Sequence, residues 1–471
     1  MEKVVGIEVH VELKSNSKVF SYAENNYSLD PNTYVSVVDL GYPGVLPRLN
    51  KKVIDMALSA ALAFNCKINK LMHFDRKNYF YPDLPKGYQI TQQDTPIGYD
   101  GYIEIEVNGN KKKIGIERIH IEEDTCKSIH TEAGTLLNAN RAGVPLIEIV
   151  SKPDLRSSEE AVAYLEKLRE ILLYLGISDV KIEEGSMRCD CNVSVHEEGT
   201  VFGTRTEIKN IGSISNVGLA INYEAKRQTE LIKAGDNIRE ETRRYDDKKN
   251  QTVLMRVKET GNDYRYFPEP DIPYVELTDE WINEVQSKMP VFADELKEKY
   301  IKLGINENNI KTIIGRLDLC NYLEKIIKEA DPVIASNLLT GEILSYLNKN
   351  CININNIKLT EISFIEVIDK IKTNELSSKQ AKELLNYLLD NGGNVDEVIS
   401  KLGLVQINDE DAIKDIIINV IDKNPSSIVD YKDGKDRALK YLMGQIMKET
   451  KGQANPVSVN KILLEILNNA K

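Results

Sequence analysis

The architecture of this chain can be approached from one segment near its start, Val4-Val5-Gly6-Ile7-Glu8-Val9-His10-Val11-Glu12-Leu13. Apolar and polar side chains alternate strictly along it, which is the pattern of a β-strand with two different faces. One face is apolar and predicts contact with a core; it carries Val5, Ile7, Val9 and Val11. The other face carries Glu8, His10 and Glu12. Two carboxylates and an imidazole in a row suit a divalent cation. Taken alone, however, the run favours a half-exposed strand with a polar outer face.

A second strand with a charged end is predicted over residues 114–124. It ends in Glu122-Glu123-Asp124, next to His120 and Arg118. A charge run of this kind is usually a solvated strand end. Three consecutive acids nevertheless repel one another unless a cation or a basic ligand is near, so the run also points to metal or phosphate chemistry.

Two more strands present alternating charges. In residues 186–195 the polar face holds Arg188, Asp190 and Asn192, and a following strand presents Glu207 and Lys209 together with Arg205. Arginine beside a carboxylate offers a phosphate clamp next to a metal ligand. A structural salt-bridge ladder across the sheet explains the same pattern equally well. On the opposite face, Cys189 and Cys191 are most simply two small buried residues.

Two proline-rich segments predict rigid loops. Tyr81-Pro82-Asp83-Leu84-Pro85 follows the basic pair Arg76-Lys77, and residues 263–271 mix aromatic rings with both charge signs, including Arg265. Proline restricts the backbone and so pre-organises polar neighbours, although such loops are commonly plain connectors.

Composition sets the class of protein. The 471 residues suggest about three domains, since a domain typically takes ~150 residues. A net charge of −12 argues against a coating nucleic-acid binder, which needs a surplus of Lys and Arg. Six scattered cysteines, no signal-peptide pattern and no long apolar run predict a cytoplasmic protein without a membrane span.

The pattern of apolar and polar residues changes along the chain, and it predicts an α+β fold with three parts. Residues 1–292 hold the short alternating runs and all five His. Beyond Pro290 the pattern is that of amphipathic helices, for example over 318–328, 335–347 and 378–389. We therefore expect a mixed-sheet domain over 1–292, an all-helical connector over 293–405 and a small helical tail over 406–471.

The chain has no G-x-x-x-x-G-K-[ST] loop, no G-x-G-x-x-G after a strand and no G-x-S-x-G elbow. Any nucleotide phosphates must then be held by metal ions and basic side chains on a sheet. No clear nucleophile set for amide hydrolysis is present either, so we expect that this chain cannot release ammonia by itself.

Several long segments of the sequence resemble the GatB family, the B subunits of tRNA-dependent amidotransferases. They are VVGIEVHVELKSNSKVFS, YFYPDLPKGYQITQ, NRAGVPLIEIVSKPD, EEGSMRCDCNVSV, GTRTEIKN, DYRYFPEPDIP and the C-terminal GKDRALKYLMGQIMKETKGQANP. They occur in order from Val4 to about Pro456, which is effectively the whole chain.

The resemblance implies an enzyme subunit that uses ATP and Mg²⁺ to phosphorylate the side-chain carboxylate of Glu-tRNA(Gln) or Asp-tRNA(Asn). Ammonia, delivered from an amidase A subunit that hydrolyses glutamine, then displaces the phosphate. A small C subunit completes the heterotrimer. The first domain is expected to resemble glutamine synthetase in fold.

The resemblance also assigns residues. It implies Mg²⁺ ligands at Glu8, His10, Glu122 and Glu123. It also implies catalytic roles for Glu8, His10, Asp190 and Glu207, of which the last two are acidic positions lining the same cradle. Candidates for binding phosphate or carboxylate are Lys77, Arg188, Lys209 and Arg265, chosen on charge and strand face as well as on resemblance.

The chain departs from the family pattern in three respects. Many relatives bind zinc through four cysteines after the first strand, where this chain has Ser21, Ala23, Ser36 and Val38, so no zinc is predicted. Asn138 stands where relatives usually have Asp and is left out of the site. Cys126 replaces a commonly small residue and is assigned no function.

Basic residues exceed acidic ones by six to three over 431–451. Such a surplus is more often an ordinary helix face. Given the resemblance, Lys435 and Lys451 become candidate phosphate contacts to tRNA, which is recognised through its shape. Two competing functions remain: a tRNA-binding scaffold with a structural polar face, and a glutamine-synthetase-like ligase acting on free glutamate.

Overall fold

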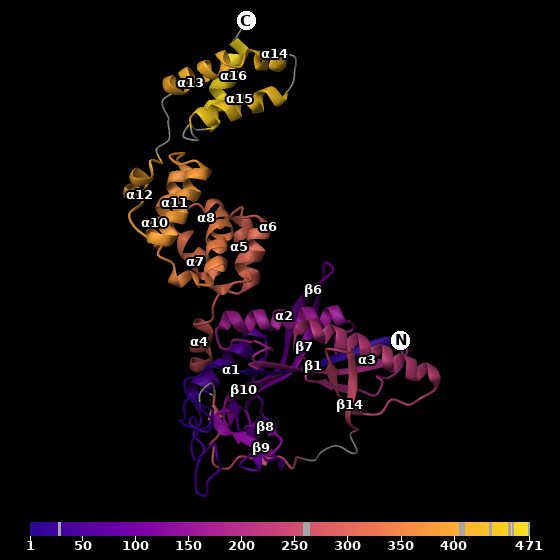
Figure 1. Cartoon of the computed structure of the whole chain (residues 1–471). Coiled ribbons are helices and arrows are strands. Elements are labelled where there is room, and N and C mark those ends of the chain that lie inside the picture. Colours follow the sequence, from indigo (N-terminus) through magenta and orange to yellow (C-terminus); the bar gives the residue numbers. More distant parts are fainter. Residues whose placement is uncertain are drawn as a thin grey trace. The chain divides into compact units, whose positions relative to one another are not determined.

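The computed structural model describes residues 1–26, 30–257, 264–404, 410–432, 436–450, 454 and 456–469. The chain divides into two compact units, Met1–Phe292 and Ala293–Lys471 (Figure 1). The predicted boundary between connector and tail, at 405/406, lies outside the described residues.

The first unit is built on a nine-stranded sheet in the order β14-β13-β12-β11-β1-β10-β7-β6-β2. From one edge to the other these strands are Gln251–Val257, Glu241–Asp246, Thr206–Lys209, Met187–His196, Glu2–Glu12, Pro145–Ser151, Asn110–Glu123, Gly98–Val107 and Lys67–Ile68. β12 and β13 run parallel, whereas β1 pairs antiparallel with both of its neighbours. The predicted mixed α+β architecture with a helical C-terminal region is confirmed.

The apolar face of the sheet forms the core of this unit. Val5, Ile7, Val9 and Val11 of β1 are completely or almost completely buried, as their alternation predicts. They belong to one hydrophobic cluster with residues of α1 (Lys51–Ala63), α2 (Ser158–Leu175) and α3 (Ile214–Ala234). Figure 1 shows α2 and α3 lying along the sheet. With helices covering one face, the polar residues of β1 are left on the other.

Helix α2 has clear start and stop signals. The Ser157 hydroxyl accepts a hydrogen bond from the Glu160 backbone N–H, which satisfies one free amide at the helix start. The helix ends at Gly176, whose φ of 67° is a left-handed conformation that glycine adopts without a steric cost.

A three-stranded sheet, β15-β4-β5, lies beside the large one and faces its polar side. Its strands are Phe267–Pro268, Asp75–Asn78 and Tyr88–Thr91. The contacts of β5 with β7 hold the two sheets together: Thr91 Oγ1 and Gln89 Nε2 both donate to the Glu122 carboxylate. Lys77 on β4 is thereby brought near the large sheet.

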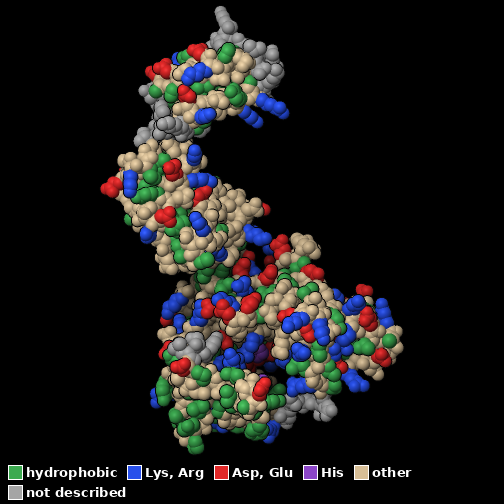
Figure 2. All heavy atoms as spheres, in the orientation of Figure 1, with side chains coloured by type: hydrophobic (Ala, Val, Ile, Leu, Met, Phe, Trp, Pro, Cys, Tyr) green, Lys and Arg blue, Asp and Glu red, His purple; other side chains and the backbone are tan. Residues whose placement is uncertain are grey.

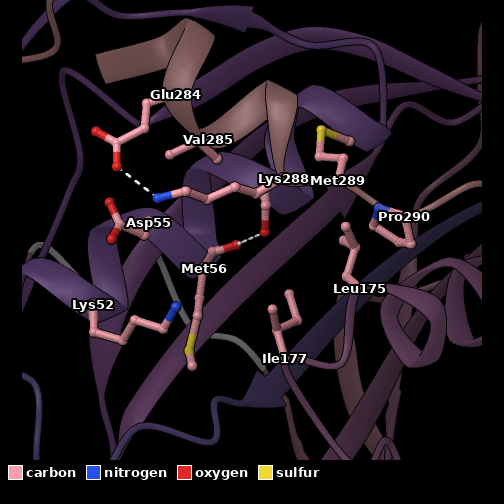
Figure 3. Close-up of a pocket in the computed structure, with 11 residues that line it drawn as sticks. Lys52, Asp55, Met56, Leu175, Ile177, Glu284, Val285, Lys288, Met289 and Pro290 are labelled. Carbon is pink, nitrogen blue, oxygen red and sulfur yellow. Dashed lines mark hydrogen bonds and ion pairs between the residues drawn. The ribbon is translucent and has the colours of Figure 1, made fainter. Parts of the chain in front are cut away.

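The first unit ends in α4 (Asp279–Ser287), which packs on α1. Trp281 Nε1 donates to Asp55 at 2.7 Å. A cavity of about 150 Å³ lies here, and Met56, Leu175 and Val285 are among the residues that line it (Figure 3). The ion pair between Lys288 and Glu284 (2.6 Å) lies at its side. The cavity is mainly a gap in helix packing, since the charges of Lys288 and Glu284 beside it are already paired with each other.

The loop between β1 and α1 is tied down by a buried ion pair. Lys18 Nζ lies 3.3 Å from Asp39 Oδ2, and the two side chains are 0% and 3% exposed. Asp39 also accepts from the backbone N–H of Ser36. These contacts fasten the loop that carries Ser21, Ala23, Ser36 and Val38.

The second unit is helical in the residues described. Its α-helices α5 to α12 are Ala293–Lys302, Glu307–Ile314, Leu317–Ile326, Pro332–Leu338, Leu344–Asn350, Glu361–Lys372, Ser378–Asn391 and Val395–Leu402. Helices α13 to α16 are Glu410–Asp422, Pro425–Lys432, Asp436–Glu449 and Pro456–Asn469, and they share a separate hydrophobic cluster. No helix among the described residues has the length and apolar character needed to span a membrane.

One predicted helix is interrupted. The pattern predicts a single helix over 335–347, but a π-helical segment, Leu339–Ile343, separates α8 from α9. Within it the Thr340 hydroxyl donates to the Ser336 carbonyl at 2.8 Å. A side chain that bonds the carbonyl four residues back competes with the backbone ladder, which accounts for the local change.

Candidate active site

The polar face of the large sheet brings distant residues together through strand register. His10 on β1 lies opposite Glu148 on β10 and Arg188 on β11. Glu148 in turn lies opposite His120 on β7. Directly opposed residues in an antiparallel pair point to the same side, so these side chains form one row across four strands. Figure 2 shows Lys and Arg side chains gathered around a hollow in the first unit.

His10 lies among three carboxylates. Its Nε2 is 3.4 Å from Glu148 Oε2, 3.8 Å from Glu122 Oε2 and 3.9 Å from Glu8 Oε1. The predicted residues Glu8, His10 and Glu122 are therefore brought together.

A second imidazole completes this group. His120 Nε2 is 3.0 Å from Glu122 Oε1 and 3.1 Å from Glu148 Oε2. The His120 side chain is only 5% exposed, and its Nδ1 has no hydrogen-bond partner among the described residues. Together with the donors Thr91 and Gln89, it fixes the Glu122 carboxylate from several sides.

Burial and neighbouring charges shift the pKa values of the titratable groups in different directions. Burial and the charge of Glu148 raise the pKa of Glu8 to about 7. Burial also disfavours the charged form of Glu148, but His120 and His10 hold its pKa well below the usual range. Burial opposes the charged form of His120 as well, yet the charges of Glu148 and Glu122 outweigh it and raise the pKa of this imidazole to about 9.

The donor set suits a divalent cation. One ligand atom from each of Glu8, His10 and Glu148 lies within 4.8 Å of the others. His120, Glu122 and Glu148 form an overlapping group under the same limit. Carboxylate oxygens are the ligands that Mg²⁺ prefers, and imidazole tolerates several metals.

The structure does not bring Glu123 to this cluster. Successive strand residues face opposite sides, so Glu123 points away from Glu122. Its buried carboxylate pairs with Lys86 and accepts from the Ile90 backbone N–H at 2.9 Å. The arrangement therefore gives no support to the predicted role of Glu123 as a metal ligand.

Among the basic candidates, Lys77 faces the cluster most directly. Burial opposes its charged form, but the Glu122 and Glu148 charges are stronger and raise its pKa. Its ammonium lies 5.0 Å from the ring centre of Tyr264 and 5.8 Å from that of Tyr79.

The other candidates are paired with side chains of the protein. Lys209 bridges Asp190 and Glu207, which confirms that these strands carry their charges on one face. Arg188 Nη2 lies 3.0 Å from Asp124 Oδ2. Arg265 is exposed, and its guanidinium lies 5.7 Å from the ring centre of Phe80.

Sequence reasoning missed Glu148, the residue shared by both groups of ligands. The available signal was a single acid inside the apolar run Pro145-Leu146-Ile147-Glu148-Ile149-Val150. Acids are almost never buried unless they are paired, so this one required partners. The two tRNA candidates Lys435 and Lys451 lie outside the described residues.

Comparison with known proteins gives the same family at both ends of the chain. The model of the GatB/GatE catalytic domain matches residues 3–283, and that of the GatB domain matches residues 321–467. The chain belongs to the GatB family. The first match includes the strand residues of the candidate site, Glu8, Glu122, Glu148 and Asp190.

Family members of known name are similar over their full length. The B subunit of the aspartyl/glutamyl-tRNA(Asn/Gln) amidotransferase of Geobacillus thermodenitrificans is 50% identical over 99% of each chain. Proteins of that name from Geobacillus kaustophilus (51%, 98% of each chain) and Bacillus cereus AH187 (49%, 99% of each chain) are equally close. The solved tRNA-binding domain of glutaminyl-tRNA synthetase from Saccharomyces cerevisiae covers 38% of this chain and 93% of its own, at 18% identity. Its TM-score of 0.25 carries no argument about the fold of the GatB family.

Proposed function

We propose that this chain is the activating subunit of a glutamine-dependent amidotransferase. It phosphorylates the side-chain carboxylate of Glu-tRNA(Gln) or Asp-tRNA(Asn) with ATP and converts it to the amide with ammonia from a partner amidase subunit. The names of the full-length relatives support the tRNA substrates. The observation that carries the chemistry is the Glu8–His10–Glu148 group on the central strands of the sheet.

Glu8, His10 and Glu148 would hold Mg²⁺, with Glu122 beside them. The ion, when bound, supplies positive charge to the phosphate oxygens and offsets the repulsion between the nucleotide and the substrate carboxylate. His120 holds Glu122 and Glu148 in place through its Nε2. Asp190 and Glu207 extend the acidic row and are kept in position by Lys209.

The proposed reaction has two steps. A substrate carboxylate oxygen forms a bond to the γ-phosphorus of ATP as the bond from that phosphorus to the ADP oxygen breaks. Ammonia then bonds to the acyl carbon, phosphate leaves with the C–O bonding pair, and the nitrogen loses a proton. In this scheme Lys77 approaches the reacting groups from β4. The charges of Glu122 and Glu148 raise its pKa, so its ammonium stays charged and can stabilise negative charge on the reacting groups.

The finer features of the assembly are part of the same proposal. We infer a glutamine-synthetase-like arrangement of the first unit, in which a mixed sheet presents its reactive groups on one face. The chain would work in the cytoplasm as a heterotrimer with an amidase A subunit and a small C subunit. Because nucleotide phosphates need cations, Arg188, Lys209 and Arg265 remain proposed ligands of phosphate or carboxylate.

Contact with tRNA through the tail is proposed for Lys435 and Lys451. Changing both to Glu should weaken tRNA affinity and lower the dependence of binding on salt, since fewer counterions are released. Unchanged affinity and salt dependence would remove these residues from the interface.

Release of ADP tests the proposed function. The reconstituted heterotrimer should release ADP only with a charged tRNA, and the Glu8→Ala variant should lose that release while still binding tRNA. A scaffold would release no ADP with either Glu-tRNA(Gln) or Asp-tRNA(Asn). Turnover of free glutamate without tRNA would instead favour the small-molecule ligase.

A further inference from the structure

Arg118 is a cation on the polar face to which no role has been assigned. It lies on β7, opposite Val150 of β10, two residues before His120 and therefore on the same side of the sheet. Its guanidinium makes no ion pair or hydrogen bond with any residue that the structure describes, and its Nε is inaccessible to solvent. Buried polar groups are normally satisfied, so this unpartnered Nε on the polar face requires an explanation.

Lys77 has the same property from the opposite side. It projects from β4 of the three-stranded sheet, and its ammonium contacts aromatic rings rather than a carboxylate oxygen in the described part of the chain. Lys209, Arg188 and Lys86, by contrast, each have an acidic partner.

The two unpaired cations lie on the facing sides of the two sheets, and the charge of each reaches Tyr266. Burial raises the pKa of this phenol, while the charges of both Lys77 and Arg118 lower it. Both cations therefore act on one side chain, which lies immediately before β15, the strand paired with β4. Arg118 approaches from the large sheet and Lys77 from the small one, on the side where Glu122 is found.

We propose that Arg118 and Lys77 form an oxyanion subsite between the two sheets, in which Arg118 binds an anionic group of a substrate. A guanidinium and an ammonium without protein partners can give an oxyanion several charge-assisted hydrogen bonds. The same chemistry fits the side-chain carboxylate of the aminoacyl group and a phosphate of the nucleotide. The choice between these two ligands rests on the proposed function.

The test compares Arg118→Gln and Arg118→Lys with the wild type in the reconstituted heterotrimer. Arg156→Gln is the matched control, because Arg156 also belongs to the first unit but already pairs with Glu2 at 3.3 Å. KM for the charged tRNA and KM for ATP are measured separately. We expect one of them to rise by about tenfold or more in Arg118→Gln, the value of one lost charge-assisted bond, and to recover partly in Arg118→Lys.

The KM value that changes identifies the ligand. A rise confined to KM for the charged tRNA assigns the carboxylate, and a rise confined to KM for ATP assigns the phosphate. A lower unfolding temperature in Arg118→Gln with both KM values unchanged would show a structural role and overturn the subsite. So would unchanged KM values without any loss of stability.

Equilibrium binding separates this proposal from the proposed function. The wild type should bind Glu-tRNA(Gln) more tightly than Gln-tRNA(Gln), or should bind inorganic pyrophosphate, and Arg118→Gln should lose that binding advantage by about tenfold. These measurements need no turnover. If the heterotrimer released no ADP but Arg118→Gln still lost the binding, the function would fail and the subsite would stand. Retention of both binding properties would overturn the subsite alone.

Discussion

Glu148 bridges the two imidazoles of the site through one oxygen: its Oε2 lies 3.4 Å from His10 Nε2 and 3.1 Å from His120 Nε2. It occupies this position because β10 lies between β1 and β7, so that Glu148 is directly opposite both histidines. Glu122 also reaches both rings, but through separate oxygens and at 3.8 Å from His10. Glu148 is therefore the structural centre of the proposed metal site.

Glu148→Gln should lower tRNA-dependent ADP release by about 100-fold and weaken Mn²⁺ or Mg²⁺ binding, because an amide removes the charge that pairs with both histidines. Binding of tRNA should be kept. Mn²⁺ titration followed by electron paramagnetic resonance measures the metal directly. Glu183→Gln, at an exposed position of the same unit, is the control and should behave as the wild type. Normal metal affinity in Glu148→Gln would refute the assignment.

Chelation should separate activity from folding. Removing divalent ions with EDTA should stop ADP release, yet leave the unfolding temperature of the first unit nearly unchanged. The reason is that His10 and His120 already compensate the charges of Glu122 and Glu148 without a metal. Differential scanning calorimetry with and without EDTA makes the comparison. A large drop in unfolding temperature would mean that the metal is structural.

Breaking the Lys18–Asp39 pair should be costly. Lys18→Met leaves a buried carboxylate without its counter-ion, for which we expect a loss of about 3–5 kcal/mol in the free energy of unfolding. Adding Asp39→Asn should recover much of this loss, since an amide still accepts from Ser36 N–H. Urea titration can follow the fluorescence of Trp281, the single tryptophan of the chain. Equal loss in the single and double variants would contradict this explanation.

Glu224 should make the first unit sensitive to acid. Burial opposes its ionisation, but hydrogen bonds from Arg227 and Gln228 hold its pKa below the ordinary value of 4.5. A depressed carboxyl pKa stabilises the fold above the pKa of the unfolded chain, and this contribution is lost as pH falls through the folded value. Glu224→Gln should therefore cost about 2 kcal/mol at pH 7 and progressively less below pH 4.5. Urea midpoints at pH 7, 5 and 4 test this, and a constant difference would disprove it.

Features that depend on neighbouring residues in the sequence could be predicted, whereas features that depend on the pairing of distant strands could not. The alternation in β1 is local, so the faces of Glu8 and His10 and the burial of Val5 to Val11 were predictable. Glu148 became part of the site only through the register of β10 between β1 and β7, and no local pattern encodes that register. The strand face of Glu123 was implicit in the two-residue period, but the run of three acids drew attention to charge rather than to direction.

The contribution of the small sheet was harder to foresee. Lys77 was selected on charge and resemblance, whereas its approach to Glu122 depends on how β4 and β5 pack against β7. Arg118 was visible in the same predicted strand as Glu122, yet its lack of a partner is a property of the folded chain alone. Sequence identifies charged residues, but only the packed structure shows which charges are already neutralised.

The position of β1 in the sheet has a consequence for synthesis of the protein. Of the nine strands, β1 leaves the ribosome first although it is the central one, and its two neighbours begin only at Pro145 and Met187. At ordinary translation rates β1 waits on the order of 10 s for its first partner. During that time its apolar face also lacks the cover of α2 and α3, which are made later still. The nascent chain is therefore a natural client for a chaperone that binds alternating apolar segments.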